Sequence, residues 1–183
     1  MAMTDRRARR RRPAFTEAAL EQAALRYVAR YATTRAKLAA YLERKLRERG
    51  WAGAAPPDLG ALVGRMAALG YVHDRAFARS RAAALARRGY GPRRVAAALQ
   101  AAGVAGDDLG EAGALAAAAA WDAAMRFARR RRIGPFAAEA PDRAGRDKAY
   151  AALLRAGHSA AIARRLAAAQ PGEIPEMDDD LAG

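Results

Sequence analysis

The chain has 183 residues, no cysteine, and a net charge of +14 that arises from 33 basic and 19 acidic residues. Without cysteine it has no disulfide, thiolate metal site or cysteine nucleophile, and its longest uncharged apolar stretch, 112–121, is about half a membrane span. Arginines begin directly after Asp5 with no apolar signal segment, which predicts a cytoplasmic protein.

The positive charge belongs to the body of the chain. Six arginines lie in the arm 6–12 and five acids in the tail 173–180, yet residues 14–172 retain 27 basic and 13 acidic residues, again +14. We expect the arm, 1–15, and the tail, 171–183, to be disordered. A basic body favours polyanionic partners, because binding releases the counterions held by their phosphates.

Alanine, leucine and arginine dominate and β-branched residues are few, a composition typical of helices. No window alternates apolar and polar residues as a half-buried strand does. Pro92 suits a first helical position, and the expected N-caps are Thr16, Thr33 or Thr34, Asp58, Asp74 and Ser159. We predict helices at 17–31, 34–49, 58–69, 74–88, 92–102, 107–132 with a break near Gly110 or Gly113, 143–156 and 159–169.

Five predicted helix ends share one pattern, in which an apolar residue is followed four positions later by glycine and then by a bulky or apolar residue. In a Schellman helix end, glycine takes the left-handed conformation just past the helix and the next side chain packs back onto it. We predict such ends at Gly50, Gly70, Gly89, Gly103 and Gly157.

Similar positions recur about every fifty residues. Aromatic residues in long helices lie 50 residues apart, and glycines that close a following helix lie 53 and 54 apart: Tyr27, Phe77 and Phe127, then Gly50, Gly103 and Gly157. We therefore predict an all-α fold of three tandem three-helix repeats, 16–70, 71–113 and 114–170, that stack into an elongated, curved molecule. The three aromatic rings are expected to form core.

Several segments carry a resemblance to a known family. They read ALRYVAR at 24–30, TRAKL at 34–38, LGYVHDRAFA at 69–78, GYGPRRV at 89–95 with Leu99 and Gly103-Val104 beyond it, and LLRAGHS at 153–159. Their order resembles that of the RecX proteins, modulators of the bacterial recombinase RecA. The resemblance covers about residues 20–168 and is most specific in the central repeat.

The resemblance implies a small monomer that lies along the groove of the RecA–single-stranded DNA filament and contacts DNA directly or through the filament. It would hinder filament growth or activity, and so lower recombination, DNA repair and the SOS response. A repeat protein with a positive face fits a long, periodic, negatively charged target better than a small ligand.

The expected binding face consists of basic residues from all three repeats. Arg75 and Arg79 share one helix face, and two arginines in the first turn after Pro92 indicate an external anion, because that end of a helix disfavours cations. The predicted binding residues are Arg26, Arg30, Arg35, Lys37, Arg75, Arg79, Arg87, Arg88, Arg93, Arg94, Arg126, Arg129 and Arg130.

Other functions stay open at this point. The Gly89-Tyr90-Gly91 turn also resembles a helix-hairpin-helix, whose backbone amides bind a DNA phosphate, and a helical adaptor for an acidic protein is a third possibility. An enzyme is not expected, since no carboxylate cluster, metal-ligand spacing or phosphate-binding loop appears and no cofactor is implied. His158 lies in a glycine turn where packing explains it, and Asp74 beside His73 is explained as a cap.

Overall fold

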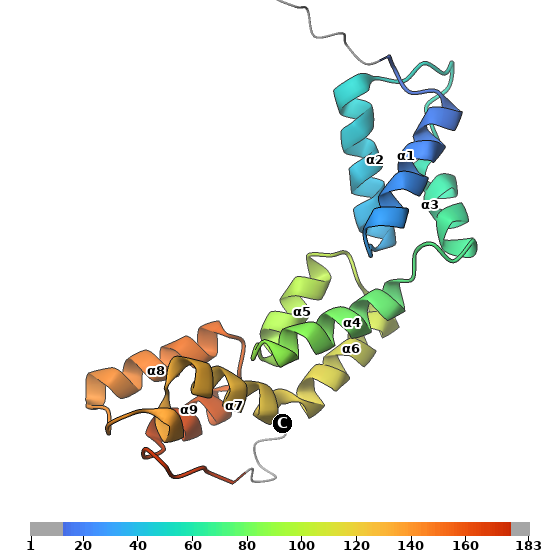
Figure 1. Ribbon diagram of the computed structural model, residues 1–183. Coiled ribbons are helices and arrows are strands. Elements are labelled where there is room, and N and C mark those ends of the chain that lie inside the picture. Colours follow the sequence, from blue (N-terminus) through green and yellow to red (C-terminus); the bar gives the residue numbers. More distant parts are fainter. Residues whose placement is uncertain (1–12, 177–183) are drawn as a thin grey trace, which may run out of the picture. The chain divides into compact units, whose positions relative to one another are not determined.

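The computed structural model describes residues 13–176, which form helices and no β-strand, so the predicted all-α class is confirmed (Figure 1). The helices are α1 (Glu17–Arg30), α2 (Arg35–Arg49), α3 (Leu59–Ala68), α4 (Asp74–Arg87), α5 (Pro92–Gln100), α6 (Gly106–Ala118), α7 (Ala120–Arg131), α8 (Arg143–Arg155) and α9 (Ala160–Ala168), with a short 3-10 helix at Gly134–Phe136. None of these helices is both long and apolar enough to span a membrane. The arginines of the arm, 6–12, and Asp178–Asp180 of the tail lie outside the described residues.

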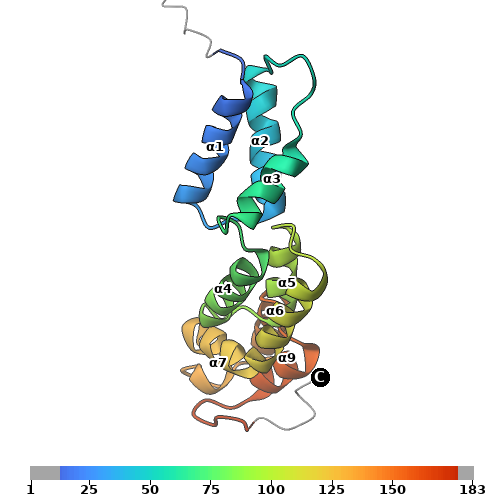
Figure 2. The same cartoon turned by 90° about the vertical axis from the view of Figure 1, so that its right-hand side faces the viewer.

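The chain divides between His73 and Asp74 into two compact units. In unit 1, α1, α2 and α3 surround a core that includes Leu38, Leu42 and Met66. Both views show these three helices packed side by side (Figure 2). Unit 1 is thus one three-helix group.

Unit 2 contains two further three-helix groups. One core, around Val95 and Leu99, lies among α4, α5 and α6, and the other, around Leu153 and Leu166, lies among α7, α8 and α9. Tyr90 packs against both cores. Three groups of three helices agree with the fifty-residue period, although α6 continues past position 113, so the limits of the repeats remain a proposal.

The three equally spaced aromatic residues take different positions. Phe127 is buried, whereas Phe77 and Tyr27 are half-buried against the edges of their cores. The Tyr27 ring also stacks on Tyr41, with ring centres 4.1 Å apart. All three rings therefore contribute to packing, to unequal extents.

Local capping signals place the helix starts. The side chains of Thr16, Thr34, Asp58 and Ser159 each accept a hydrogen bond from the amide three residues further on, which satisfies an otherwise unpaired helical donor. Asp142 does the same at the start of α8, at 2.7 Å, although it was not predicted.

The predicted glycines all adopt positive φ. Gly70, Gly89, Gly103 and Gly157 form the two hydrogen bonds of a Schellman end, as in Tyr90 N to Leu85 O at 3.1 Å and Gly89 N to Ala86 O at 2.8 Å. Gly50 differs, because the chain leaves α2 extended and its carbonyl accepts from the Phe15 amide at 3.0 Å. The prediction of a Schellman end is therefore wrong at Gly50.

The break predicted near Gly110 or Gly113 lies instead at Ala119, between α6 and α7. Both glycines remain helical with open space around them, so neither has a packing reason to end the helix. Ala119 separates the residues that pack into the first core of unit 2 from those that pack into the second. Tertiary packing, and not backbone freedom, sets this break.

Two glycine turns of unit 2 pack backbone against backbone. The Gly91 amide donates to Ala156 O at 2.9 Å, and the Arg93 amide donates to Gly157 O at 3.2 Å. A Cβ added at Gly91 would lie 2.4 Å from the Gly157 carbonyl, and one at Gly157 would lie 2.4 Å from the Arg94 amide nitrogen. We call the two segments, 89–91 and 157–159, the interlocked turns; they join the two three-helix groups of unit 2.

Candidate functional site

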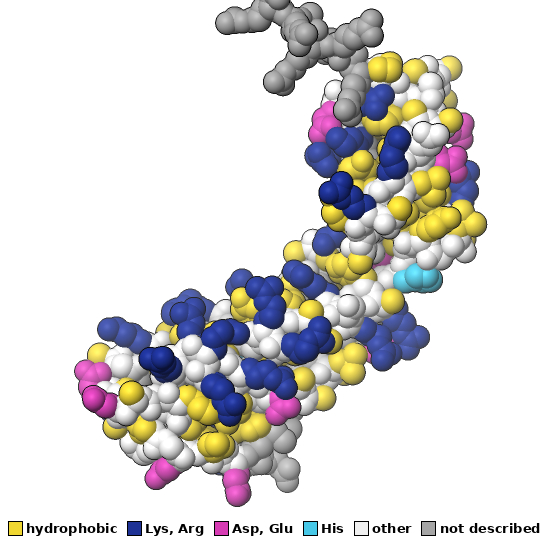
Figure 3. Space-filling view, viewed as in Figure 1, with side chains coloured by type: hydrophobic (Ala, Val, Ile, Leu, Met, Phe, Trp, Pro, Cys, Tyr) yellow, Lys and Arg dark blue, Asp and Glu magenta, His cyan; other side chains and the backbone are white. Residues whose placement is uncertain are grey.

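Every basic residue predicted for binding is exposed. Four belong to unit 1 and nine to unit 2, where dark blue side chains gather over α4, α5, α7 and α8 with few acids among them (Figure 3). These residues differ in their immediate surroundings, which divides them into separate sites.

Arg75 and Arg79 on α4 share one acidic partner. Arg75 Nε lies 2.7 Å from Glu111 Oε2, and a terminal nitrogen of Arg79 lies 2.8 Å from Glu111 Oε1. The hydrogen bond from Arg75 is the main reason that the pKa of Glu111 lies below its ordinary value. This pair on α4 is thus partly neutralised within unit 2, although all three side chains remain accessible.

Five arginines of unit 2 line one groove of about 840 Å³ together with Tyr90 and Phe127. No acid lines the groove, and none of the five forms an ion pair with another residue between 13 and 176. We call it the arginine groove, and its arginines are Arg88, Arg94, Arg130, Arg131 and Arg155.

Four of these arginines lie at or just after the C-terminal ends of helices. Arg88 follows α4, Arg130 and Arg131 end α7, and Arg155 ends α8. Carbonyl groups at helix C-termini carry partial negative charge, which favours cations there and offsets part of their mutual repulsion. One such contact is direct, since a terminal nitrogen of Arg130 donates to Arg88 O at 2.6 Å.

The sequence identified Arg88, Arg94 and Arg130 of this groove and missed Arg131 and Arg155. Arg87, Arg93, Arg126 and Arg129 are not in its lining, and Arg126 lies 4.0 Å from Asp122. The sequence contains a signal that could have identified Arg155. Like Arg88, it lies within two positions of a predicted glycine helix end.

The start of α5 was expected to receive an external anion at Arg93 and Arg94, and for their side chains this stays a prediction, but the backbone amides there are already bonded. The Arg93 amide is bonded to Gly157 O, and those of Arg94 and Val95 to Gly91 O. The Gly91 amide is bonded to Ala156 O. The amides that a helix-hairpin-helix would offer to phosphate are therefore used inside the protein, which removes the structural basis of that alternative.

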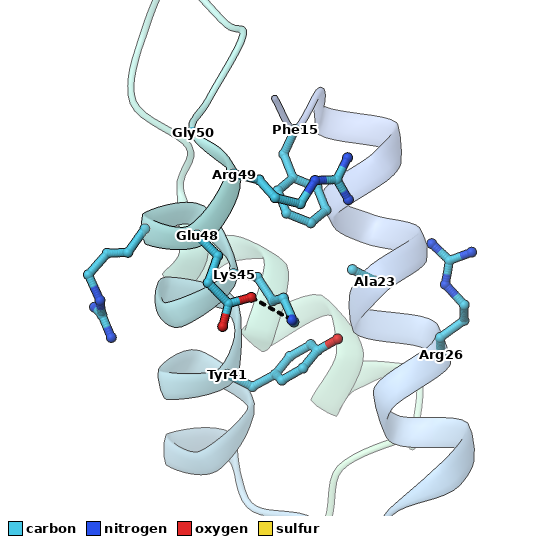
Figure 4. A pocket seen from close by; sticks show the side chains of 9 residues that line it. Phe15, Ala23, Arg26, Tyr41, Lys45, Glu48, Arg49 and Gly50 are labelled. Atoms are coloured by element: carbon cyan, nitrogen blue, oxygen red, sulfur yellow. Dashed lines mark hydrogen bonds and ion pairs between the residues drawn. The ribbon is translucent and has the colours of Figure 1, made fainter. Parts of the chain in front are cut away.

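Unit 1 has its own basic hollow of about 990 Å³ between α1 and α2, lined by Arg26, Tyr41, Lys45 and Arg49 (Figure 4). Here Lys45 and Arg49 have partners. Lys45 Nζ lies 2.6 Å from Glu48, a hydrogen bond that lowers the Glu48 pKa, and Arg49 lies over the Phe15 ring and donates to Pro13 O. Of the residues predicted in unit 1, Arg26 lines this hollow, whereas Arg30, Arg35 and Lys37 do not.

A buried histidine lies behind the arginine groove. His158 has no exposed surface, and its Nε2 donates to Gly89 O at 3.1 Å, which leaves Nδ1 unprotonated and without a partner in the described residues. Burial lowers the pKa of His158 below its ordinary 6.5. The predicted packing role is consistent with this position, and the ring also ties the two interlocked turns together.

The buried imidazole makes unit 2 sensitive to acid. Because the pKa of His158 is lower in the folded state than its ordinary 6.5 in the unfolded chain, the free energy of unfolding should be constant above that pH as far as this group is concerned. Below it, stability should fall by up to about 1.4 kcal/mol per pH unit. Urea unfolding between pH 7.5 and 5.5 measures this slope.

Two variants isolate the contribution of His158. His158→Gln keeps a donor for Gly89 O but does not titrate, so its stability should depend less on pH. His73→Gln leaves His158 in place and should retain the slope of the parent protein. Equal slopes in all three proteins would contradict the assignment.

Among residues 13–176 no group of three or more His, Asp or Glu side chains is arranged to hold a metal ion. Whatever the arginine groove binds, its own chemistry is that of guanidinium groups, which donate paired hydrogen bonds to phosphate or carboxylate oxygens.

Comparisons with known proteins identify the family. The model of the second three-helix domain of RecX matches residues 74–112, which contain α4 and α5. The regulatory protein RecX of Myxococcus xanthus (strain DK1622) is 34% identical over 160 residues, which cover 83% of this chain and 86% of that protein.

Solved structures show the same fold. The crystal structure of RecX from Lactobacillus salivarius matches with a TM-score of 0.61 at 18% identity, over 81% of this chain and 92% of that one. A second crystal structure, of regulatory protein RecX, matches with a TM-score of 0.58 at 18% identity, over 79% of this chain and 68% of that one. This chain belongs to the RecX family.

Proposed function

We propose that this protein binds the RecA–single-stranded DNA filament as a monomer in the cytoplasm and lowers RecA activity, and thereby recombination, DNA repair and the SOS response. It acts by binding and catalyses no reaction. Membership of a family of regulatory proteins supports the role. The observation that carries it is the arginine groove, where five guanidinium groups lie together with no acid from the described part of the chain.

The groove suits a polyanion for a physical reason. Like charges held together without a counter-charge repel one another, and an anion that enters removes this repulsion while releasing its own counterions. Arg26, Arg30, Arg35 and Lys37 of unit 1 and the remaining predicted arginines of unit 2 add longer-range attraction, which steers the protein toward a negatively charged filament.

The ATPase rate of RecA on single-stranded DNA tests this proposal. The rate should fall when the protein is added well below the concentration of RecA, because one bound molecule that stops filament growth affects many protomers. The effect should weaken as salt rises, since phosphate contacts release counterions. A rate that does not change would contradict the proposal.

If the ATPase rate does not change, two further measurements distinguish the alternative functions. Tight, salt-dependent binding to bare DNA would then support a direct DNA-binding protein, although one that does not use the Gly89–Gly91 amides. Absence of any DNA dependence would instead support an adaptor for an acidic protein.

A further inference from the structure

Aromatic rings lie beneath the guanidinium groups of the arginine groove. The guanidinium carbons of Arg88 and Arg94 lie 5.8 and 5.5 Å from the centre of the Tyr90 ring. Those of Arg130 and Arg131 lie 5.7 and 5.9 Å from the Phe127 ring. Each ring thus holds two cations within the range of a cation–π interaction.

These rings are poorly placed to stack on nucleic-acid bases. Phe127 is 5% exposed, and its ring also packs 5.9 Å from that of His158. Tyr90 is half-buried between the two cores of unit 2. Stacking requires an open ring face, whereas these rings are in contact with core residues and with arginines.

The arginines, by contrast, are exposed and held in place. Arg130 is anchored at Arg88 O as well as at Phe127, so its orientation is fixed by two contacts. A guanidinium group that is already oriented loses less side-chain entropy when it binds phosphate. The groove therefore presents several oriented donors over an apolar floor.

We propose that the arginine groove binds a run of consecutive phosphates without contacting bases, and that Tyr90 and Phe127 are positioning residues that hold its guanidinium groups. The phosphates come from a single-stranded nucleic acid or from inorganic polyphosphate, which share this chemistry. The proposal deepens the proposed function by naming what the groove recognises, but its test contains no RecA.

The test compares three probes with the full-length protein by fluorescence anisotropy. A labelled thymidine oligonucleotide and a labelled abasic oligonucleotide of the same length should bind with similar affinity, within about threefold, whereas one stacked base would contribute about 5- to 150-fold. Inorganic polyphosphate should displace both. Binding should weaken with salt, with a log–log slope of about 0.7 for each phosphate contacted.

Variants of Tyr90 test the positioning role. Tyr90→Leu removes no charge, yet it should weaken binding of both oligonucleotides about fivefold, because two guanidinium groups lose their ring. Tyr90→Phe keeps the ring and should restore the affinity. Arg88→Gln with Arg94→Gln should weaken both as well, whereas Arg164→Gln, an exposed arginine of α9 outside the groove, should not.

Each contrary outcome overturns a defined part of the proposal. Abasic DNA that binds more than tenfold more weakly, or Tyr90→Leu that affects only the thymidine oligonucleotide, would show base contact. Polyphosphate that fails to compete, or groove variants that bind like the parent, would remove the phosphate site. Thermal unfolding of each variant separates lost affinity from lost folding. A RecA assay that fails while these results hold would reject the proposed function alone.

The relative affinities identify the source of the phosphates. An oligonucleotide that binds more tightly than polyphosphate with as many phosphates would support nucleic acid as the ligand. The reverse order would support polyphosphate. Both results agree with a groove that recognises a phosphate chain.

Discussion

Replacing Gly91 with alanine is expected to destabilise unit 2 by about 3 kcal/mol, because the added methyl group has no room. Its Cβ would lie 2.4 Å from the carbonyl of Gly157 and 2.5 Å from the His158 amide nitrogen, both backbone atoms that cannot rotate away. The N-cap φ of Gly91 is −78°, which alanine adopts without strain, so the loss is purely one of space.

Urea unfolding followed by the fluorescence of Trp121 measures this effect. The chain has two tryptophans, so a Trp51→Phe background leaves only the one in unit 2. The unfolding midpoint of Gly91→Ala should fall by about 1–2 M urea.

Gly110→Ala is the matched control. Gly110 is helical, and an added Cβ meets nothing within 4 Å, so this substitution should stabilise unit 2 by about 0.5–1 kcal/mol. If Gly91→Ala instead behaves like Gly110→Ala, the close approach of the interlocked turns is not present in solution.

Reversing three charges of the arginine groove is expected to abolish most of the effect on RecA. In Arg88→Glu, Arg94→Glu, Arg155→Glu, three attractive contacts become repulsive, and the concentration needed to halve the RecA ATPase rate should rise by about 100-fold or more. The salt dependence of that concentration should flatten at the same time, because fewer counterions are released.

A charge-matched control separates the groove from net charge. Arg81→Glu, Arg143→Glu, Arg164→Glu changes the charge of unit 2 by the same amount at exposed positions that do not line the groove. For this control variant, the concentration needed to halve the RecA ATPase rate should rise far less. Equal losses in the two triple variants would show that overall charge, and not the groove, carries the binding. Circular dichroism confirms that each variant is folded.

Arg75 and Arg79, which were also predicted to bind, are less informative for such a test. Both are bonded to Glu111, so reversing them would bring three acids together and disturb the contact of α4 with α6. A loss of activity would then have two explanations. Within residues 13–176 the arginine groove has no acidic partner, so its variants give a result with one explanation.

Features of the fold that depend on neighbours in the chain could be predicted. Thr16, Thr34, Asp58 and Ser159 cap helices because a short polar side chain reaches the amide three residues on, whatever the rest of the fold does. Four of the five glycine helix ends follow for the same reason.

Features that depend on packing could not be predicted. Arg132 ends α7 in the left-handed conformation at φ 54° and forms the same two hydrogen bonds as a glycine Schellman end, with Ile133 N at 2.9 Å from Ala128 O. An arginine gives no local sign of this conformation. It is stabilised by the burial of Ile133 in the core among α7, α8 and α9.

The candidate site likewise has some features that could be predicted from the sequence and others that depend on packing. Exposure and excess positive charge could be predicted from composition, and all thirteen predicted residues are indeed exposed. Which basic residues lie together could not be predicted, because Arg94 and the unpredicted Arg155 meet only through the packing of α5 beside the turn after α8. The unexpected feature, a start of α5 whose amides are already bonded, arises from that packing as well.

The arginines of the groove lie far apart in the chain, so the ribosome synthesises them at different times. Arg88 and Arg94 belong to the first three-helix group of unit 2, whereas Arg130, Arg131 and Arg155 belong to the second. During synthesis the groove cannot exist before α8 has left the ribosome and its following turn has closed on Gly91. A nascent or proteolytically shortened chain that lacks α8 therefore keeps unit 1 and much of the positive charge, but it cannot form the arginine groove.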